Sequence, residues 1–121
     1  MDTRSKILTS SDSVPRSCTL VSGYFDVLLA EHARELGAVR DRTGGPIVVI
    51  VLADAEEILS QRARAELVAS LRMVDYVVTA DHEDLHRLIE RLNPAEVVRL
   101  EEADRRRTRR LIEDVQRGQT R

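Results

Sequence analysis

The stretch that decides the fold is residues 18–32, which read CTLVSGYFDVLLAEH. Its apolar first half ends at Gly23 and predicts a buried strand. Beyond the glycine, residues that suit one helix face recur at spacings of three and four, at Leu29, His32, Leu36 and Val39. This period predicts a helix. A strand, a glycine and a helix in this order predict the first turn of a Rossmann-like sheet, beyond which such folds bind their ligands.

The next strong signal is PIVVIVLAD at residues 46–54, which is apolar on both faces. Such a strand lies at the centre of a parallel sheet covered by helices. Further strands are predicted at 74–78 and 96–100, and helices at 56–72, 81–92 and 103–117. The predicted buried face of the helix at 56–72 carries Leu59, Ala63, Leu67 and Leu71. The alternation predicts an α/β fold, a Rossmann-like three-layer α/β/α domain with a mainly parallel, doubly wound sheet of about four strands.

The chain length of 121 residues suits one domain. Residues 1–16 are polar and rich in serine, so we expect a flexible N-terminal arm there. Residues 17–121 are expected to form a single domain that contains these strands and helices.

Composition disfavours several classes of function. The formal net charge of −2 gives no overall attraction to nucleic acid or to an anionic membrane. Cys18 is the one cysteine, which rules out an internal disulfide and fits a reducing compartment. The longest apolar run is far too short to span a membrane, and the polar start has no signal-peptide core. We therefore expect a cytoplasmic protein that binds neither membrane nor nucleic acid.

Two residues at predicted strand ends suit a nucleotide or a phosphorylated small molecule. Gly23 lets the backbone approach a phosphate closely, and the start of the following helix offers free N–H groups, although a purely structural glycine explains the pattern equally well. Asp54 is placed to contact a ribose or a metal-bound water, or else serves as an acidic helix start. His82 and His86 have the spacing of helical metal sites, but no third ligand is evident, and no protein metal site is expected.

Residues 23–36 resemble the signature GxFDxxHxGHxxxL of the cytidylyltransferase-like nucleotidyltransferases. This family includes glycerol-3-phosphate cytidylyltransferase and the adenylyltransferase domain of heptose biosynthesis. The required positions are held by Gly23, Phe25, Asp26, His32 and Leu36. Residues 64–78, RAELVASLRMVDYVV, resemble the family's stretch that leads into its third strand. The resemblance covers residues 18–100 and implies the same Rossmann-like fold.

The resemblance also implies roles for the residues of the first turn. His32 would stabilise the transferring phosphoryl group, the backbone of Gly23, Tyr24 and Phe25 would hold phosphates, and Asp26 would organise the loop. A plainer interpretation stays open for two of them. His32 would then be a semi-buried residue of the helix, and Asp26 its N-cap.

Two positions depart from the signature. Leu29 stands where the family has its first histidine, and Glu31 stands where it has a glycine. Leucine cannot donate a hydrogen bond to a phosphate, and loss of one such donor costs about 10²–10³ in rate in comparable sites. Glu31 adds a negative charge and fills the space of the glycine. Both changes predict weakened or lost nucleotidyl transfer.

The family's second phosphate-binding element is a Ser/Thr-rich turn at the start of the last helix. Here the segment reads RRRTRRLIEDV, in which Thr108 keeps its spacing and arginines, among them Arg107 and Arg109, take the neighbouring positions. Guanidinium groups match phosphate geometry, so these three residues are candidate phosphate ligands. The alternative is a solvated helix whose arginines are neutralised by nearby carboxylates, at Glu101, Glu102 and Asp104.

Two functions follow from the resemblance. The first is an enzyme that transfers a nucleotidyl group from ATP or CTP to a sugar or polyol phosphate, with Mg²⁺ as its cofactor. The second is a relative without catalysis that binds a nucleotide or phosphate as a sensor or as a partner subunit. A homodimer is compatible with both, because family members often form dimers.

Overall fold

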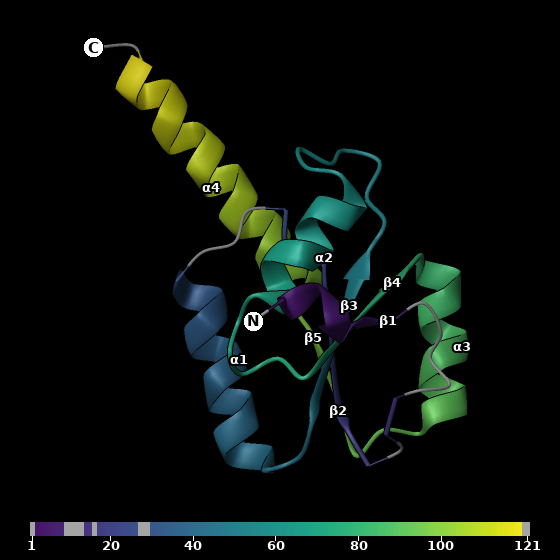
Figure 1. Ribbon diagram of the computed structural model, residues 1–121. Helices are drawn as coiled ribbons and strands as arrows, with labels where there is room; N and C mark the ends of the chain where they lie inside the picture. The colour runs from purple at the N-terminus through teal and green to yellow at the C-terminus, as the bar shows by residue number, and fades with distance from the viewer. Residues whose placement is uncertain (1, 9–13, 16, 27–29, 120–121) are drawn as a thin grey trace.

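The computed structural model describes residues 2–8, 14–15, 17–26 and 30–119, and it shows one parallel α/β sheet (Figure 1). Within these ranges the sheet has five strands in the order β1-β4-β3-β2-β5. The strands are β1 (Ile7–Leu8), β2 (Thr19–Gly23), β3 (Ile47–Leu52), β4 (Tyr76–Ala80) and β5 (Glu96–Arg99). The helices are α1 (Ala30–Thr43), α2 (Gln61–Ala69), α3 (His82–Leu92) and α4 (Glu101–Gln119), with a short 3₁₀ helix η1 at Thr3–Lys6. The predicted Rossmann-like α/β fold is confirmed.

The order of the strands reverses beside β2. The chain proceeds from β2 to β3 and β4 on one side, and then returns to place β5 on the other side of β2. All four pairings are parallel, and β2 is paired in register with both β3 and β5. The carboxyl ends of β2 and β5 therefore border the topological switch point, where open α/β sheets bind ligands.

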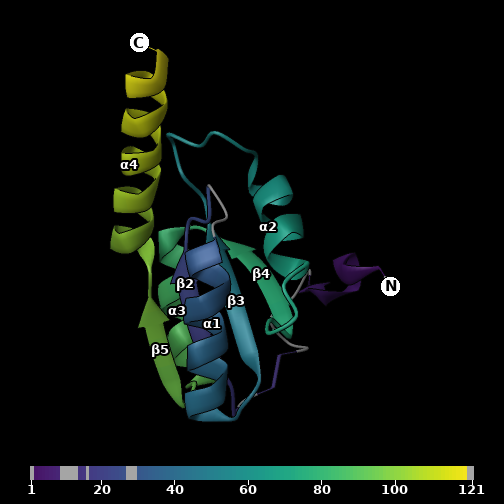
Figure 2. The ribbon, with the colours of Figure 1, turned by 90° about the vertical axis from the view of Figure 1, so that its left-hand side faces the viewer.

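Helices cover the sheet on both faces, which gives three layers (Figure 2). On one face α1 and α2 contribute Leu36, Ala65 and Val68 to a core cluster. On the opposite face α3 contributes a stripe at helical spacing, Leu85, Leu88 and Leu92. Strand β3 is buried along its whole length, because its side chains pack into both clusters.

The N-terminal segment differs from the expected arm. Residues 7–8 form strand β1, which pairs with β4 at the edge of the sheet, and η1 precedes it. Lys6 also donates a hydrogen bond to the carbonyl oxygen of Leu71. A strand of two residues shows no period in the sequence, which explains why it was missed and why the sheet was expected to have about four strands.

Helix α2 also differs from its prediction. The helix was expected to begin at residue 56 but begins at Gln61. Ser60 is its N-cap, because its side chain accepts a hydrogen bond from the N–H of Ala63. Its buried residues are Arg64, Ala65, Val68 and Ala69, whereas the predicted core residues Leu59 and Leu67 are 37% and 41% exposed. Leu71 does pack against the core cluster, although it follows the end of the helix at Ala69. The positions of Leu59 and Leu67 were wrong because the buried face combines Val68 with two alanines and one arginine, which give little hydrophobic signal.

Helix α4 runs away from the body of the domain (Figures 1 and 2). Near its start Asp104 and Arg107 are buried, and residues 111–118 are exposed. No helix among the described residues is long and apolar enough to cross a membrane.

Candidate functional site

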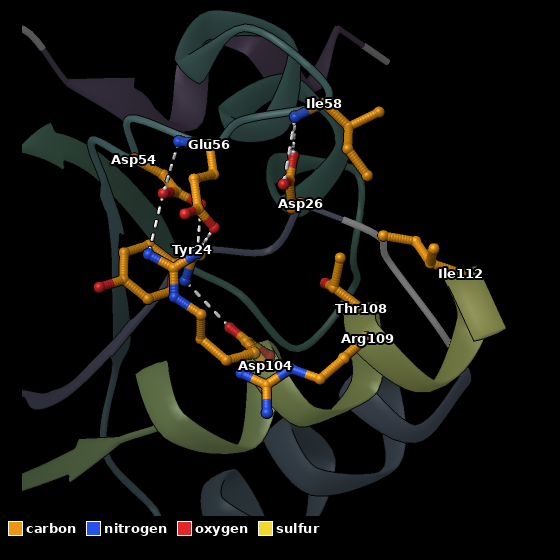
Figure 3. A pocket seen from close by; sticks show the side chains of 10 residues that line it. Tyr24, Asp26, Asp54, Glu56, Ile58, Asp104, Thr108, Arg109 and Ile112 are labelled. Atoms are coloured by element: carbon orange, nitrogen blue, oxygen red, sulfur yellow. Dashed lines mark hydrogen bonds and ion pairs between the residues drawn. The ribbon is translucent and has the colours of Figure 1, made fainter.

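A pocket of about 160 Å³ lies at the switch point, beyond the carboxyl ends of β2 and β3 and beside the start of α4 (Figure 3). We call it the switch-point pocket. Its lining is Tyr24, Asp26, Asp54, Glu56, Ile58, Asp104, Arg105, Thr108, Arg109 and Ile112. The residues predicted from the sequence that meet here are Tyr24, Asp26, Asp54, Thr108 and Arg109. They come from three separate segments, which the strand order brings together.

The turn after β2 presents two consecutive backbone N–H groups to one carboxylate. The N–H groups of Tyr24 and Phe25 lie 3.0 and 3.2 Å from Oδ2 of Asp104. Phe25 has a φ of 51°, in the left-handed region that few residues other than glycine adopt. Such a turn forms an anion-binding concavity. In this structure the anion is a side chain of the protein itself.

The predicted catalytic residue His32 contacts the same carboxylate. Its Nε2 lies 2.6 Å from Oδ1 of Asp104, and both side chains are almost fully buried, at 1% and 2% exposure. The imidazole also lies against the ring of Phe25, with 5.4 Å between the ring centroids. His32 is therefore placed behind the wall of the switch-point pocket and not in its lining. Leu29, which stands at the first histidine position of the signature, lies outside the described residues.

Arg107 belongs to this buried group as well. Its Nη1 lies 3.3 Å from Oδ1 of Asp104, its Nε lies 3.1 Å from Glu31, and its Nη2 pairs with Glu35. Burial lowers the pKa of Arg107, but the negative charges of Glu35, Glu31 and Asp104 outweigh this and raise it above the ordinary value. Glu31, which replaces the glycine of the signature, thus anchors Arg107 to α1. Neither residue lines the switch-point pocket.

Asp54 lines the switch-point pocket beyond the end of β3, and its carboxylate forms an ion pair with Arg105. The two side chains form a two-pronged ion pair with distances of 2.9 and 3.1 Å. The guanidinium of Arg105 lies 4.3 Å from the centroid of the Tyr24 ring, a cation–π contact. Burial alone would raise the pKa of Asp54, but the N–H of Glu56 and the guanidinium of Arg105 outweigh burial and lower it. Asp54 is therefore ionised at neutral pH.

Asp26 organises the loop that closes the switch-point pocket on one side. Its carboxylate accepts hydrogen bonds from the N–H groups of Ile58 and Leu59, at 2.9 to 3.2 Å, and it is 5% exposed. These bonds hold the loop before α2 against the turn that follows β2. Helix α1 begins at Ala30, and residues 27–29 just before it lie outside the described part. The alternative role of Asp26 as the N-cap of this helix therefore stays a prediction.

Sequence reasoning missed Arg64, which binds the backbone of the pocket-lining residue Tyr24. Its side chain is fully buried and donates to the carbonyl oxygens of Tyr24 and Leu52 at 2.8 Å each. A further nitrogen pairs with Glu57 at 2.9 Å. Arg64 is the first residue of the second stretch that resembles the family, residues 64–78. The signal that could have revealed its buried position is that it shares a helix face with Ala65, Val68 and Ala69.

The electrostatics of the switch-point pocket are acidic. Four carboxylates line it against two guanidinium groups, and Arg105 is already paired with Asp54. No group of three or more side chains among the described residues is arranged to hold a metal ion. Mg²⁺ that binds together with phosphates needs only one or two protein carboxylates, and Glu56, which is 84% exposed, is the one at hand, because both oxygens of Asp54 are paired with Arg105. The donor set is compatible with a nucleotide-borne Mg²⁺.

No protein-family model and no curated protein sequence matches the chain. One similar solved structure is that of the lipopolysaccharide core biosynthesis protein from Thermoplasma volcanium GSS1, with a TM-score of 0.60 and 22% sequence identity. The similarity covers 67% of this chain and 71% of that protein. At this level of identity the similarity supports the fold.

Proposed function

We propose that this chain is a nucleotidyltransferase-like protein that binds a nucleotide at the switch-point pocket without transferring the nucleotidyl group. One observation carries the proposal. Five residues that the sequence singled out for nucleotide or phosphate contacts line one pocket at the switch point, although they come from separate segments, and they are Tyr24, Asp26, Asp54, Thr108 and Arg109. The similarity to a lipopolysaccharide core biosynthesis protein agrees with a nucleotidyltransferase-like fold.

The size and charge of the pocket indicate which part of the nucleotide it takes. A volume of about 160 Å³ is below the 300–1,000 Å³ of whole-ligand sites and suits a sugar with an adjoining phosphate. Asp54, at the end of the strand next to β2, holds the position from which Rossmann-type sheets bind ribose hydroxyls. Because the lining is acidic, we propose that Mg²⁺ strengthens the binding of a polyphosphate.

The absence of transfer follows from the buried group around Asp104. The N–H groups of Tyr24 and Phe25 and the imidazole of His32 are the donors that the family resemblance assigns to phosphates, and all three contact the Asp104 carboxylate. A donor held by a carboxylate does not stabilise charge on a transferring phosphoryl group. Leu29 and Glu31 remove further features of the family's signature.

Calorimetric titration of the whole chain with ATP and with CTP, each with Mg²⁺, tests binding. We expect saturable binding of at least one of them, and no pyrophosphate release above background when sugar or polyol phosphates are added. Asp54→Asn should weaken binding by about tenfold or more, since hydrogen bonds to charged groups contribute about 1.5–3 kcal/mol. Glu90→Gln, an exposed carboxylate on α3, is the matched control and should leave the affinity unchanged.

Two results would contradict the proposal. One is the absence of binding for both nucleotides in the presence and absence of Mg²⁺. The other is pyrophosphate release at rates typical of enzymes, about 1 per second or faster, which would make the chain an active transferase.

A further inference from the structure

The buried group around Asp104 has the composition of a complete anion-binding site. Two backbone N–H groups, one imidazole nitrogen and one guanidinium converge on a single carboxylate, with distances of 2.6 to 3.3 Å. They belong to Tyr24, Phe25, His32 and Arg107. Arg107 lies on α4 together with Asp104, so we call the three donors outside α4, those of Tyr24, Phe25 and His32, the cradle. The cradle is almost closed to solvent, since Phe25 is fully buried and His32 is 1% exposed.

The occupant of the cradle comes from a distant part of the chain. Asp104 lies 72 to 80 residues from the three donors of the β2 turn and α1 that it contacts. The backbone N–H of Asp104 donates to the carbonyl oxygen of Leu100, so the first turn of α4 is closed by its own backbone. The Asp104 carboxylate contacts the cradle donors, and α4 is the element that places it there.

Gly23 and Phe25 show that the backbone is shaped around this anion. A Cβ atom on Gly23 would lie 2.6 Å from Oδ2 of Asp104, so only a glycine allows the carboxylate to come so close. The left-handed φ of Phe25 turns two successive N–H groups to the same side. Both features also occur in sites that bind phosphate through backbone donors.

The switch-point pocket and the cradle share Asp104. Asp104 lines the pocket together with Arg105 and Thr108. Its oxygens also contact the cradle donors, and Figure 3 shows Asp104 beside Tyr24, whose backbone N–H is one of them. A phosphate of a ligand in the pocket is therefore separated from the cradle by the Asp104 carboxylate alone. Two negative groups cannot share one set of donors at this distance, so they compete.

We propose that Asp104 is a built-in competitor of phosphate, which occupies the cradle and excludes a phosphate group from it until the Asp104 carboxylate is displaced. The inference rests on the proposed function for the class of ligand, and it adds an autoinhibitory contact to the same site. It predicts that the cradle accepts a free oxyanion once the carboxylate and its volume are removed.

Inorganic phosphate is the probe, and the melting temperature of the whole chain is the readout. Asp104→Ala removes both charge and volume, so phosphate at 50 mM should raise its melting temperature by about 5 °C or more beyond the rise in the natural chain. Asp104→Asn keeps the volume, so it should be less stable than the natural chain yet gain no such response. Glu102→Ala removes a carboxylate from the same helical turn at an exposed position and should respond like the natural chain. Sodium chloride at equal ionic strength corrects for screening.

The outcomes separate this inference from the proposed function. If Asp104→Ala responds to phosphate no more than Glu102→Ala does, the inference is wrong, even where the natural chain binds a nucleotide. If Asp104→Ala gains the phosphate response while the natural chain binds neither ATP nor CTP, the inference holds and the proposed function fails. If Asp104→Ala is unfolded without phosphate, 100 mM phosphate must restore its helical circular dichroism, and failure to do so overturns the inference.

Discussion

At the scale of single residues, Gly23 sets the distance between the β2 turn and α4. A Cβ atom at this position would lie 2.6 Å from Asp104 and 2.8 Å from the ring of Phe25. Asp104 is held by four donors and Phe25 is fully buried, so neither neighbour moves easily. The glycine is thus a requirement of the anion contact as well as a feature of the family signature.

Gly23→Ala should lower the free energy of unfolding by about 1–3 kcal/mol, because it overpacks a closed site. Gly37→Ala is the matched control. It lies within α1, where the nearest atom to an added Cβ is 3.9 Å away, and it should raise stability by up to about 1 kcal/mol. Urea unfolding of both variants checks the pair. Equal effects of the same sign at the two positions would contradict the close approach of Asp104.

The sequence identified part of the site and missed the rest for a physical reason. Tyr24, Asp26 and Asp54 follow strands whose apolar runs are unmistakable, so their place at the carboxyl edge of the sheet was predictable. Asp104 had been considered only as a neutralising neighbour of the arginines. Its contact with the β2 turn depends on how α4 crosses the sheet edge, and no local pattern in the sequence encodes that crossing.

At the scale of elements, Arg64 ties helix α2 to the two central strands. It donates to the carbonyl oxygens of Tyr24, at the end of β2, and of Leu52, at the end of β3. A third bond reaches the carbonyl oxygen of Leu59 in the loop before α2. The bonds to the carbonyl oxygens of Tyr24 and Leu52 are buried, so water does not replace the guanidinium there. We call these three bonds the Arg64 clamp, which holds together the ends of β2 and β3 and the loop before α2.

Arg64→Met should destabilise the fold by about 2–5 kcal/mol, because it leaves the buried carbonyl groups of Tyr24 and Leu52 without a hydrogen-bond donor. Arg64→Lys should recover little of this loss, since one ammonium group cannot reach all these acceptors. Arg62→Met, on the exposed side of the same helix, should change stability by less than about 0.5 kcal/mol. Guanidinium chloride unfolding measures all three, and a cost at Arg64 no larger than that at Arg62 would refute the Arg64 clamp.

The elements themselves were predicted with uneven success. Strand β3 and its neighbour β2 follow from long apolar runs, and α3 follows from a clear amphipathic stripe capped by Asp81. The predicted core positions Leu59 and Leu67 were wrong because a buried arginine and alanines line much of the buried face of α2. Strand β1 was missed because two residues carry no period. The errors fall where tertiary contacts, and not local pattern, decide the structure.

At the scale of the whole molecule, the strand order creates the site. Because β5 returns to the far side of β2, the first turns of α4 arrive beside the turn that follows β2. The backbone N–H of Leu100 donates to the carbonyl oxygen of Ser22 at 2.8 Å, which fixes this arrival. The fold class could be predicted from the alternation of strands and helices. The contact between Asp104 and the cradle could not be predicted in this way, because it depends on the order of all the strands in the sheet.

The most direct test of the central claim is a two-dimensional ¹H–¹⁵N NMR titration of the whole chain with ATP or CTP in the presence of Mg²⁺. We expect the largest chemical-shift changes on amides around the switch-point pocket, at Tyr24, Glu56, Ile58, Thr108 and Arg109. We expect no change on amides near Gly44 and Gly45, at the opposite end of the sheet. Absence of any change, or changes gathered at that opposite end, would contradict it.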